Sequence, residues 1–231
     1  MDPRRAATSF AAAHAVVSED TRDRLLLAAL RLFAHQGYAR TSTRELAEAA
    51  SVNVAAISYY FGDKAGLYRA VCTRAVGPPE ADIARFSDPA LTMVQALRGF
   101  YEGFLEPLRQ GDIASLCMKL HLREMLEPTG LGDRALIDGI QPVHDKLTEL
   151  LARHLGLPLP DIELQRLAVC LAGLGVHVHC GRSITEEISP GLYSGPAAID
   201  DWSDRLVRFA LAMVQAEAQR RGLSLTGNLN P

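Results

Sequence analysis

The sequence has few cysteines and no long apolar run, and these shortages exclude several classes of protein. Four cysteines among 231 residues, with no Cys-x-x-Cys pair, are too few for a disulfide scaffold, so we interpret them as reduced thiols in a cytoplasmic protein. The absence of about eighteen uninterrupted apolar residues argues against a membrane-spanning helix and a membrane partner. An apolar share of 48% and a charged share of 22% are typical of a soluble globular chain and exclude wholesale disorder.

The net charge of −3 by itself argues against a nucleic-acid-binding protein, but the charge is unevenly distributed. Residues 1–76 hold ten lysines and arginines against seven aspartates and glutamates, a net charge of +3. Residues 77–231 hold fourteen against twenty, a net charge of −6. A basic front and an acidic back indicate two units with different partners.

Apolar residues recur with helical spacing along the chain, and no alternating strand pattern is convincing, so we predict an all-α fold. We expect a disordered arm over residues 1–20, a three-helix block over 21–76 and a second helical block over 77–231. An alternative for the arm is that Arg4 and Arg5 reach DNA. The helices expected in the second block cover residues 91–108, 113–126, 134–155 with a kink or split at Pro142, 162–179 and 199–221, with a loop over 181–199.

The front block has the pattern of a helix-turn-helix. A support helix begins near Thr21 and ends at Gly37. The run Ser42-Thr43-Arg44-Glu45 fits a capping box that opens a short helix. After a break, Asn53 is suited to cap a second short helix, which runs to about Phe61. Two short helices that follow a longer one predict a unit able to place its second short helix in the major groove of DNA.

The second short helix has an outward surface with small residues and hydroxyl groups. If Ile57 points inward, a rotation of 100° per residue places Ala55 and Tyr59 on the opposite side. Small side chains allow a helix to approach base edges, and hydroxyl groups can bind phosphates or bases. A generic helical hairpin within a bundle explains the same pattern and stays open as an alternative.

Five motifs in the front block, in order and at family spacing, resemble the TetR-type transcriptional repressors. They are Gly37-Tyr38, the run from Thr41 to Ala50, Val52-Asn53, the run from Ile57 to Phe61, and the run from Lys64 to Tyr68. Three stretches downstream resemble the C-terminal domain of the CecR branch of this family. They are the run from Arg123 to Pro128, Gln141-Pro142 and the run from Leu155 to Pro158.

The resemblance implies that the front block binds an operator in double-stranded DNA. Thr43 would bind a phosphate, Arg44 a base or a phosphate, and Lys64 a phosphate. The reading surface would consist of Val54, Ala55, Ala56, Ser58, Tyr59 and Tyr60. Because these contacts are few and weakly charged, the protein would act as a twofold dimer on a near-palindromic operator, with half-sites about 34–36 Å apart.

The front block departs from the family pattern at two positions. Ser51 stands where the family usually has a glycine in the turn, and a left-handed backbone there would cost a serine about 1 kcal/mol. Ser58 stands where the family often has a phosphate-binding tyrosine. A contact at position 58 would therefore be short or mediated by water.

The acidic back block suits dimerisation and ligand sensing. We predict, mostly from the resemblance, a dimer interface of Ala168, Ala172, Gly173, Gly175, Trp202, Leu206, Phe209 and Met213. An apolar cavity for a small apolar or amphipathic effector would be lined by Phe100, Phe104, Met118, Leu122 and Met125. Packing into the core of the same chain needs the same residue types and is the alternative for both sets. The function predicted is a homodimeric repressor that a small-molecule effector releases from DNA.

A cluster of potential metal ligands offers an alternative function, a small all-α enzyme or a metal-sensing protein. His177, His179 and Cys180 lie close in sequence, with Cys170 upstream. However, His177 and His179 would point about 200° apart on a helix, and no matching fourth ligand is visible. We therefore expect no metal and no cofactor.

Two further groups of titratable residues could suggest acid–base chemistry. They are His121 with Glu124, and His144 with Asp145 and Glu149. We interpret both groups as solvated helix faces. The sequence also has no phosphate-cradling glycine loop and no nucleophile-elbow motif, so we do not predict an enzyme. A helical protein-interaction module remains an alternative, and it would show no salt-dependent affinity for DNA.

Overall fold

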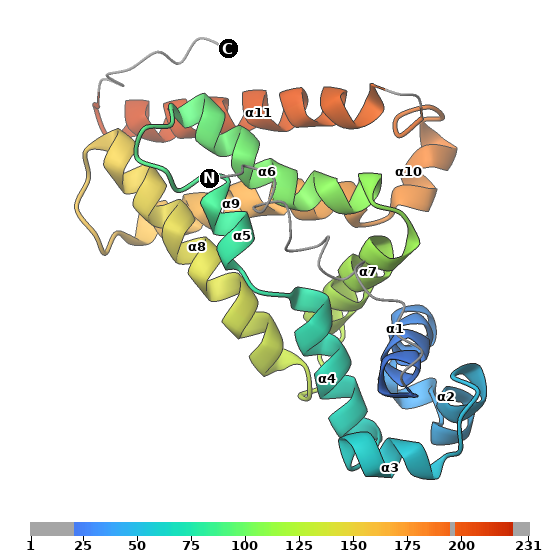
Figure 1. Ribbon diagram of the computed structural model, residues 1–231. Coiled ribbons are helices and arrows are strands. Elements are labelled where there is room, and N and C mark those ends of the chain that lie inside the picture. The colour runs from blue at the N-terminus through green and yellow to red at the C-terminus, as the bar shows by residue number, and fades with distance from the viewer. Residues whose placement is uncertain (1–20, 195–196, 224–231) are drawn as a thin grey trace, which may run out of the picture. The chain divides into compact units, whose positions relative to one another are not determined.

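The computed structural model describes residues 21–194 and 197–223, and within these ranges the chain forms helices and no strands (Figure 1). The all-α prediction is confirmed. The expected arm over residues 1–20, with Arg4 and Arg5, lies outside the described residues. Among the described residues, no helix is both long enough and apolar enough to cross a membrane.

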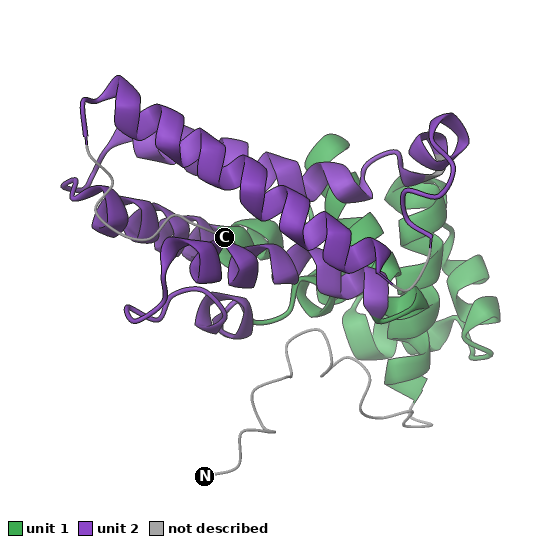
Figure 2. Ribbon diagram, turned by 90° about the horizontal axis from the view of Figure 1, so that it is seen from above, with its two compact units in different colours: residues 1–78, 110–140 green, residues 79–109, 141–231 purple. Residues whose placement is uncertain are grey.

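The chain divides into two compact units (Figure 2). Unit 1 contains residues up to 78 together with 110–140, and unit 2 contains 79–109 together with residues from 141 onward. The first unit boundary falls close to the end of the predicted front block. Residues 110–140, which the sequence suggested as part of the back block, group with unit 1.

Unit 1 is built around a long first helix. Its helices are α1 (Thr21–Arg40), α2 (Thr43–Ala49), α3 (Ala55–Phe61), α4 (Lys64–Val76), α7 (Asp112–Leu126) and the first part of α8 (Asp133–Leu155). Helix α1 packs against both α4 and α7, and its apolar face supplies the buried Leu25, Ala29 and Phe33. Removing these side chains from water provides the main stabilisation of the unit.

Gly37 interrupts α1 but does not end it. Its φ of +81° and ψ of 167° are not helical, and one further turn follows up to Arg40. A side chain at this φ would be strained. It would also meet the guanidinium of Arg123 on α7, because a Cβ at Gly37 would lie 3.1 Å from Nη1. The predicted end of the helix at Gly37 is therefore a kink.

Unit 2 is a bundle in which α6 packs against α11 and α9. Its helices are α5 (Glu80–Ala84), α6 (Met93–Arg109), the second part of α8, α9 (Ile162–His179), α10 (Arg182–Ile188) and α11 (Ala198–Arg220). Helix α8 runs as one helix through Pro142, so of the two alternatives predicted at this proline, a kink or a split, the split is wrong. The predicted loop over 181–199 is also wrong in part, because α10 forms within it.

Helix α5, which the sequence analysis did not predict, lies against two glycines of α6. A Cβ on Gly99 would lie 2.1 Å from the backbone oxygen of Arg85, directly after α5. Gly103 is 3.6 Å from the carboxyl group of Asp82 on α5, measured in the same way. Glycine lowers the helix propensity of α6, but position 99 needs it because the backbone of Arg85 approaches closely, whereas a Cβ at position 103 would make only an ordinary van der Waals contact.

Candidate nucleic-acid interface

The predicted capping box at the start of α2 is confirmed. The Oγ of Ser42 accepts a hydrogen bond from the backbone N–H of Glu45 at 3.2 Å, and the backbone N–H of Ser42 donates to Oε2 of Glu45 at 2.7 Å. These hydrogen bonds lower the pKa of Glu45. Helix α2 then buries Leu46 and Ala47 against the support helix. The start of the helix-turn-helix is thus fixed by residues close in sequence.

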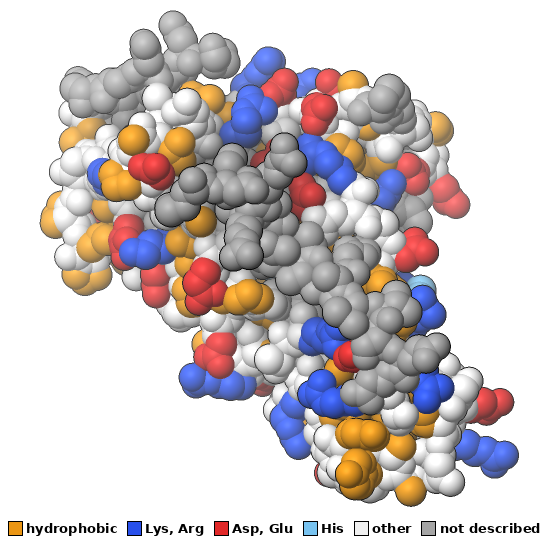
Figure 3. All heavy atoms as spheres, in the orientation of Figure 1, with side chains coloured by type: hydrophobic (Ala, Val, Ile, Leu, Met, Phe, Trp, Pro, Cys, Tyr) orange, Lys and Arg blue, Asp and Glu red, His pale blue; other side chains and the backbone are white. Residues whose placement is uncertain are grey.

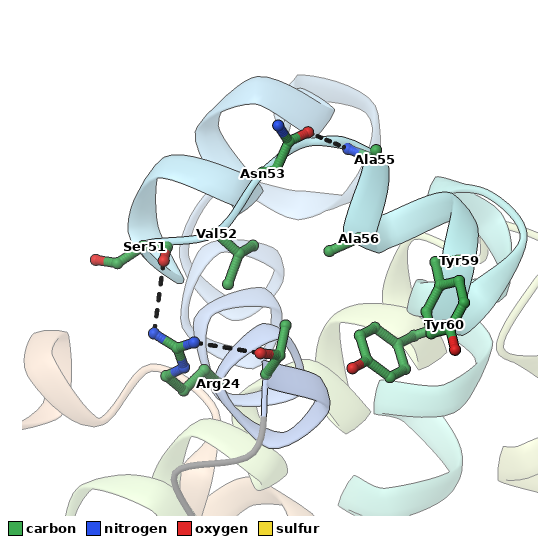
Figure 4. A pocket seen from close by; sticks show the side chains of 9 residues that line it. Arg24, Ser51, Val52, Asn53, Ala55, Ala56, Tyr59 and Tyr60 are labelled. Atoms are coloured by element: carbon green, nitrogen blue, oxygen red, sulfur yellow. Dashed lines mark hydrogen bonds between the residues drawn. The ribbon is translucent and has the colours of Figure 1, made fainter.

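The turn between α2 and α3 contains the strained residue that the sequence suggested. Ser51 has a φ of +54°, in the left-handed region. Its backbone N–H donates to the carbonyl of Glu48 at 3.0 Å, and its carbonyl accepts from Arg24 at 3.5 Å. Asn53 Oδ1 accepts from the backbone N–H of Ala55 at 2.8 Å and so holds the first turn of α3 (Figure 4).

Ser51→Gly is expected to raise the free energy of unfolding by about 1 kcal/mol, because glycine adopts a left-handed backbone without the steric cost. The backbone hydrogen bonds of residue 51 are retained. Urea unfolding followed by circular dichroism measures the change. Ser189→Gly is the control, since Ser189 has a φ of −137° and should gain nothing. Equal changes for the two variants would contradict the strain at Ser51.

Helix α3 buries one side and exposes the other, as predicted. Ile57 is 2% exposed, whereas Tyr59 is 82% exposed. Val54, Ala55, Ser58 and Tyr60 are also exposed, and Ala56 is half-buried. The space-filling view shows apolar and uncharged side chains gathered over α3, with Lys and Arg side chains nearby (Figure 3). The residues proposed to line the reading surface therefore lie together on the accessible side of α3.

A shallow hollow of about 460 Å³ lies between the start of α1 and α3 (Figure 4). It is lined by Thr21, Arg24, Ser51, Val52, Asn53, Ala55, Ala56, Tyr59 and Tyr60. The guanidinium of Arg24 donates to Oγ1 of Thr21 at 3.3 Å and to the carbonyl of Ser51. Sequence reasoning missed Thr21 and Arg24, because only the packing of α1 beside the turn brings them to this surface.

The three cationic or hydroxyl side chains assigned to phosphates differ in their surroundings. Thr43 and Arg44 are exposed on the first turn of α2. Lys64 is half-buried, and its ammonium donates to the carbonyl oxygens of Tyr38 at 2.9 Å and Thr41 at 2.8 Å. It also lies 4.1 Å from the centre of the Tyr38 ring. Two of its three N–H groups are thus used within unit 1, which leaves one for a ligand.

The interpretation of His121 and Glu124 as a solvated helix face is wrong. Glu124 is 2% exposed and is a hydrogen-bonded acceptor inside unit 1. His121 is half-buried, and burial lowers its pKa to about 4. Side-chain spacing along α7 did not show that α4 covers this side of the helix. In the second group, Asp145 and Glu149 are exposed as expected.

One member of the histidine and cysteine cluster at the end of α9 makes a hydrogen bond within unit 2. Nε2 of His179 lies 2.6 Å from the carbonyl oxygen of Phe104, a distance at which the ring N–H donates. His177 is exposed, and Cys180 is half-buried. Within residues 21–194 and 197–223, no three His, Cys, Asp or Glu side chains form a group that could hold a metal ion.

The five residues expected to line an effector pocket fall in different units. Phe100 and Phe104 belong to α6 of unit 2, and their rings contact each other at 5.4 Å between centres. Met118, Leu122 and Met125 belong to α7 of unit 1. Phe100 is buried and Met125 is exposed. The pocket therefore stays a prediction from the sequence.

The expected dimer-interface residues divide into buried and accessible sets. Ala168, Gly175 and Leu206 are buried within unit 2, and Ala172, Trp202 and Met213 are half-buried. A Cβ on Gly175 would lie 2.6 Å from the ring of Phe104, so this glycine makes room for α6. Gly173 and Phe209 are exposed. The buried members pack inside their own chain, which was the alternative for this set.

Two family models match the chain over separate ranges. The model described as bacterial regulatory proteins of the tetR family matches residues 25–71. The model described as the C-terminal domain of the HTH-type transcriptional dual regulator CecR matches residues 93–216.

Curated relatives agree with these matches. The chain is 31% identical over 161 residues to the HTH-type transcriptional dual regulator CecR of Shigella flexneri. The matched region covers 64% of this chain and 71% of the relative. It is 51% identical over 47 residues to the probable HTH-type transcriptional regulator YttP of Bacillus subtilis, which covers 20% of this chain and 23% of that protein.

Solved structures show the same fold, and the sequence matches identify the family. A TetR-like transcriptional regulator from Rhodococcus sp. RHA1 has a TM-score of 0.59 at 23% identity, covering 84% of this chain and 96% of that one. The fatty acid degradation regulator FadR from Bacillus halodurans has a TM-score of 0.58 at 18% identity, covering 81% and 94%. The chain therefore belongs to the TetR family and is a DNA-binding transcriptional regulator with a helix-turn-helix and a C-terminal domain of the CecR type.

Proposed function

We propose that this regulator is a homodimeric repressor that reads a near-palindromic operator with α3 and releases it when a small molecule binds. The observation that carries the proposal is the two-sided burial of α3. Ile57 anchors the helix to unit 1, while Ala55 and Tyr59 face solvent. Such a helix fits the major groove, where each base pair presents a distinct edge.

Direct readout in this proposal uses small and hydroxyl-bearing side chains. The methyl group of Ala55 can contact a thymine methyl, and the hydroxyl groups of Ser58 and Tyr59 can bond to bases or phosphates. Thr43 binds a DNA phosphate, Arg44 binds a base or a phosphate beside the groove, and Arg24 adds a cation at the start of α1. Because the reading surface carries little charge, one copy binds weakly, and a second copy on an inverted half-site supplies the remaining affinity.

The second copy docks on an apolar surface formed by α9 and α11, which pack against each other. We define the α9–α11 face as Val169, Gly173, Phe209 and Ala212, all of which are exposed. Val169 is 62% exposed although it is a β-branched apolar residue. Small residues beside larger apolar ones allow the helices of two copies to approach closely. This face replaces the buried members of the interface that the sequence suggested.

Selection of binding sites from random DNA tests the proposed operator. The expected product is a pair of inverted half-sites about one helical turn apart, about 34–36 Å between centres. Recovery of DNA without a shared sequence would contradict specific readout by α3. Because the relative from Shigella flexneri is described as a dual regulator, a reporter gene behind the selected site should be scored for activation as well as repression.

Release by an effector follows from linkage. The dimer has one form that binds the operator and one that does not. A small apolar or amphipathic compound weakens operator binding only if its affinity for the second form is higher than for the first. Operator affinity measured across a panel of such compounds identifies the effector. A compound that binds the protein but leaves operator affinity unchanged is not the effector.

Lys64→Ala is expected to weaken binding to every DNA sequence and to reduce the slope of log affinity against log salt by about 1, because one phosphate contact is lost. Arg69→Ala is the control, since it removes an exposed cation from the same helix and should leave the slope unchanged. Fluorescence anisotropy titrations over a range of salt measure both slopes. An unchanged slope for Lys64→Ala would reject its phosphate contact.

A further inference from the structure

Glu124 is a buried carboxylate for which the proposed function has no role so far. It is 2% exposed, and its Oε2 accepts a hydrogen bond from the hydroxyl of Tyr68 on α4 at 2.5 Å. Its Oε1 accepts three more, from the backbone N–H of Thr129 at 3.0 Å, the hydroxyl of Thr129 at 2.8 Å and the backbone N–H of Gly132 at 3.1 Å. One carboxylate thus joins α4 to the turn between α7 and α8.

These hydrogen bonds keep the carboxylate charged inside the unit. Burial by itself raises the pKa of Glu124, but the bonds from Tyr68, Thr129 and Gly132 outweigh burial and hold the pKa below its ordinary value. The turn is closely fitted around the group, since a Cβ on Gly132 would lie 2.8 Å from Cδ of Glu124. A buried ion that is fully hydrogen-bonded holds its neighbours in one geometry.

Tyr68 connects this carboxylate to the entrance of the helix-turn-helix. Its ring is fully buried and packs edge-on against Tyr38, with 5.0 Å between ring centres. The Tyr38 ring in turn lies under the ammonium of Lys64, which binds the carbonyl oxygens of Tyr38 and Thr41. Thr41 directly precedes Ser42, the N-cap of α2. The contacts therefore form one connected set from Glu124 to the start of the helix-turn-helix.

We propose that Glu124 is a positioning residue for operator binding, which acts through Tyr68, Tyr38 and Lys64 to hold the start of α2, and so α3, in its DNA-reading orientation. The inference rests on the proposed function, because it assumes that α3 enters the groove. Glu124 touches no DNA in this scheme. Its loss changes the geometry of the helix-turn-helix and removes no side chain that contacts a phosphate.

The test uses Glu124→Gln and Tyr68→Phe in the full-length protein. Tyr68→Phe removes the donor of the central hydrogen bond, and Glu124→Gln replaces its charged acceptor by a neutral amide, each with little change in shape. We expect affinity for the selected operator to fall about tenfold, which lies within the range found for residues that act on a site through others. The salt slope should not change, because no ion pair with DNA is lost. Hydrogen exchange of the backbone amides of α2 and α3 should become faster.

Tyr101→Phe is the matched control. The hydroxyl of Tyr101 is also buried, and it donates to the carbonyl oxygen of Leu171 at 3.1 Å within unit 2. This variant should lose comparable stability and keep the operator affinity of the wild-type protein. Circular dichroism and thermal unfolding establish that all variants are folded at the temperature of the binding assay.

The possible outcomes separate this inference from the proposed function. Wild-type affinity in folded Tyr68→Phe overturns the role of Glu124, and so does an equal loss in Tyr68→Phe and Tyr101→Phe. A loss in Tyr68→Phe alone, with the salt slope unchanged, supports the role even if Glu124→Gln fails to fold. A wild-type protein without salt-dependent affinity for DNA contradicts the proposed function instead.

Discussion

Ala55→Glu is expected to weaken operator binding by at least about a hundredfold while the protein stays folded. Ala55 is the exposed first residue of α3, so the new carboxylate would enter the groove beside the DNA phosphates. The loss combines one base contact, about 1–3 kcal/mol, with repulsion from the DNA backbone. Helix α3 itself should tolerate the change, because a negative charge is favourable at a helix N-terminus. Anisotropy titration with the selected operator measures the effect.

Thr73→Glu is the control for added charge. Thr73 is exposed on α4, outside the surface assigned to DNA, so this variant carries the same extra charge without entering the groove. Its operator affinity should stay within about threefold of the wild-type value. If Ala55→Glu binds the operator as tightly as Thr73→Glu does, α3 does not read the groove. The two-sided burial of α3 then does not support the proposed function.

Val169→Asp is expected to convert the proposed dimer to monomers and to weaken operator binding by about a hundredfold or more. In a twofold interface the substitution buries two carboxylates close together, at a cost of several kcal/mol. A monomer then binds one half-site without the gain in effective concentration that the second half-site provides. Analytical ultracentrifugation measures the association state, and titration with operators carrying one or two half-sites measures the affinity.

Ile137→Asp is the matched control for an exposed apolar residue. Ile137 is 54% exposed on α8, against 62% for Val169, and it is also β-branched. This variant should remain dimeric and keep its operator affinity. Dimers that persist in Val169→Asp would exclude the α9–α11 face as the interface, and monomers in the wild-type protein would exclude dimerisation altogether.

The helix-turn-helix was predicted almost completely, because it depends on interactions between near neighbours in the sequence. The capping box joins Ser42 to Glu45, only three residues apart. The outward position of Tyr59 follows from the helical rotation that separates it from Ile57. The left-handed backbone at Ser51 was suggested by the resemblance to the family, which usually has a glycine in this turn. For the capping box and the outward side of α3, a few residues of sequence contain all the information that is needed.

Interactions between distant segments were predicted poorly. Glu124 and Tyr68 are 56 residues apart, so helical spacing placed Glu124 on a solvated face although α4 covers it. Arg24 and Ser51 are 27 residues apart, and their contact beside the proposed DNA-reading surface was missed. The dimer set contained residues such as Gly175, whose small size serves packing against Phe104 in the same chain.

By itself, the order of residues determined that this chain is helical, where most helices begin and end, and which residues of α3 point outward. Those properties follow from backbone hydrogen bonding and the 3.6-residue repeat, which act over a few positions. Only the tertiary structure decided which apolar and charged residues are buried, and therefore which are left to bind a partner. Burial depends on which other segment covers a helix face. The apolar periodicity of a helix is the same whether that face packs on the core of its own chain, on a second copy or on DNA.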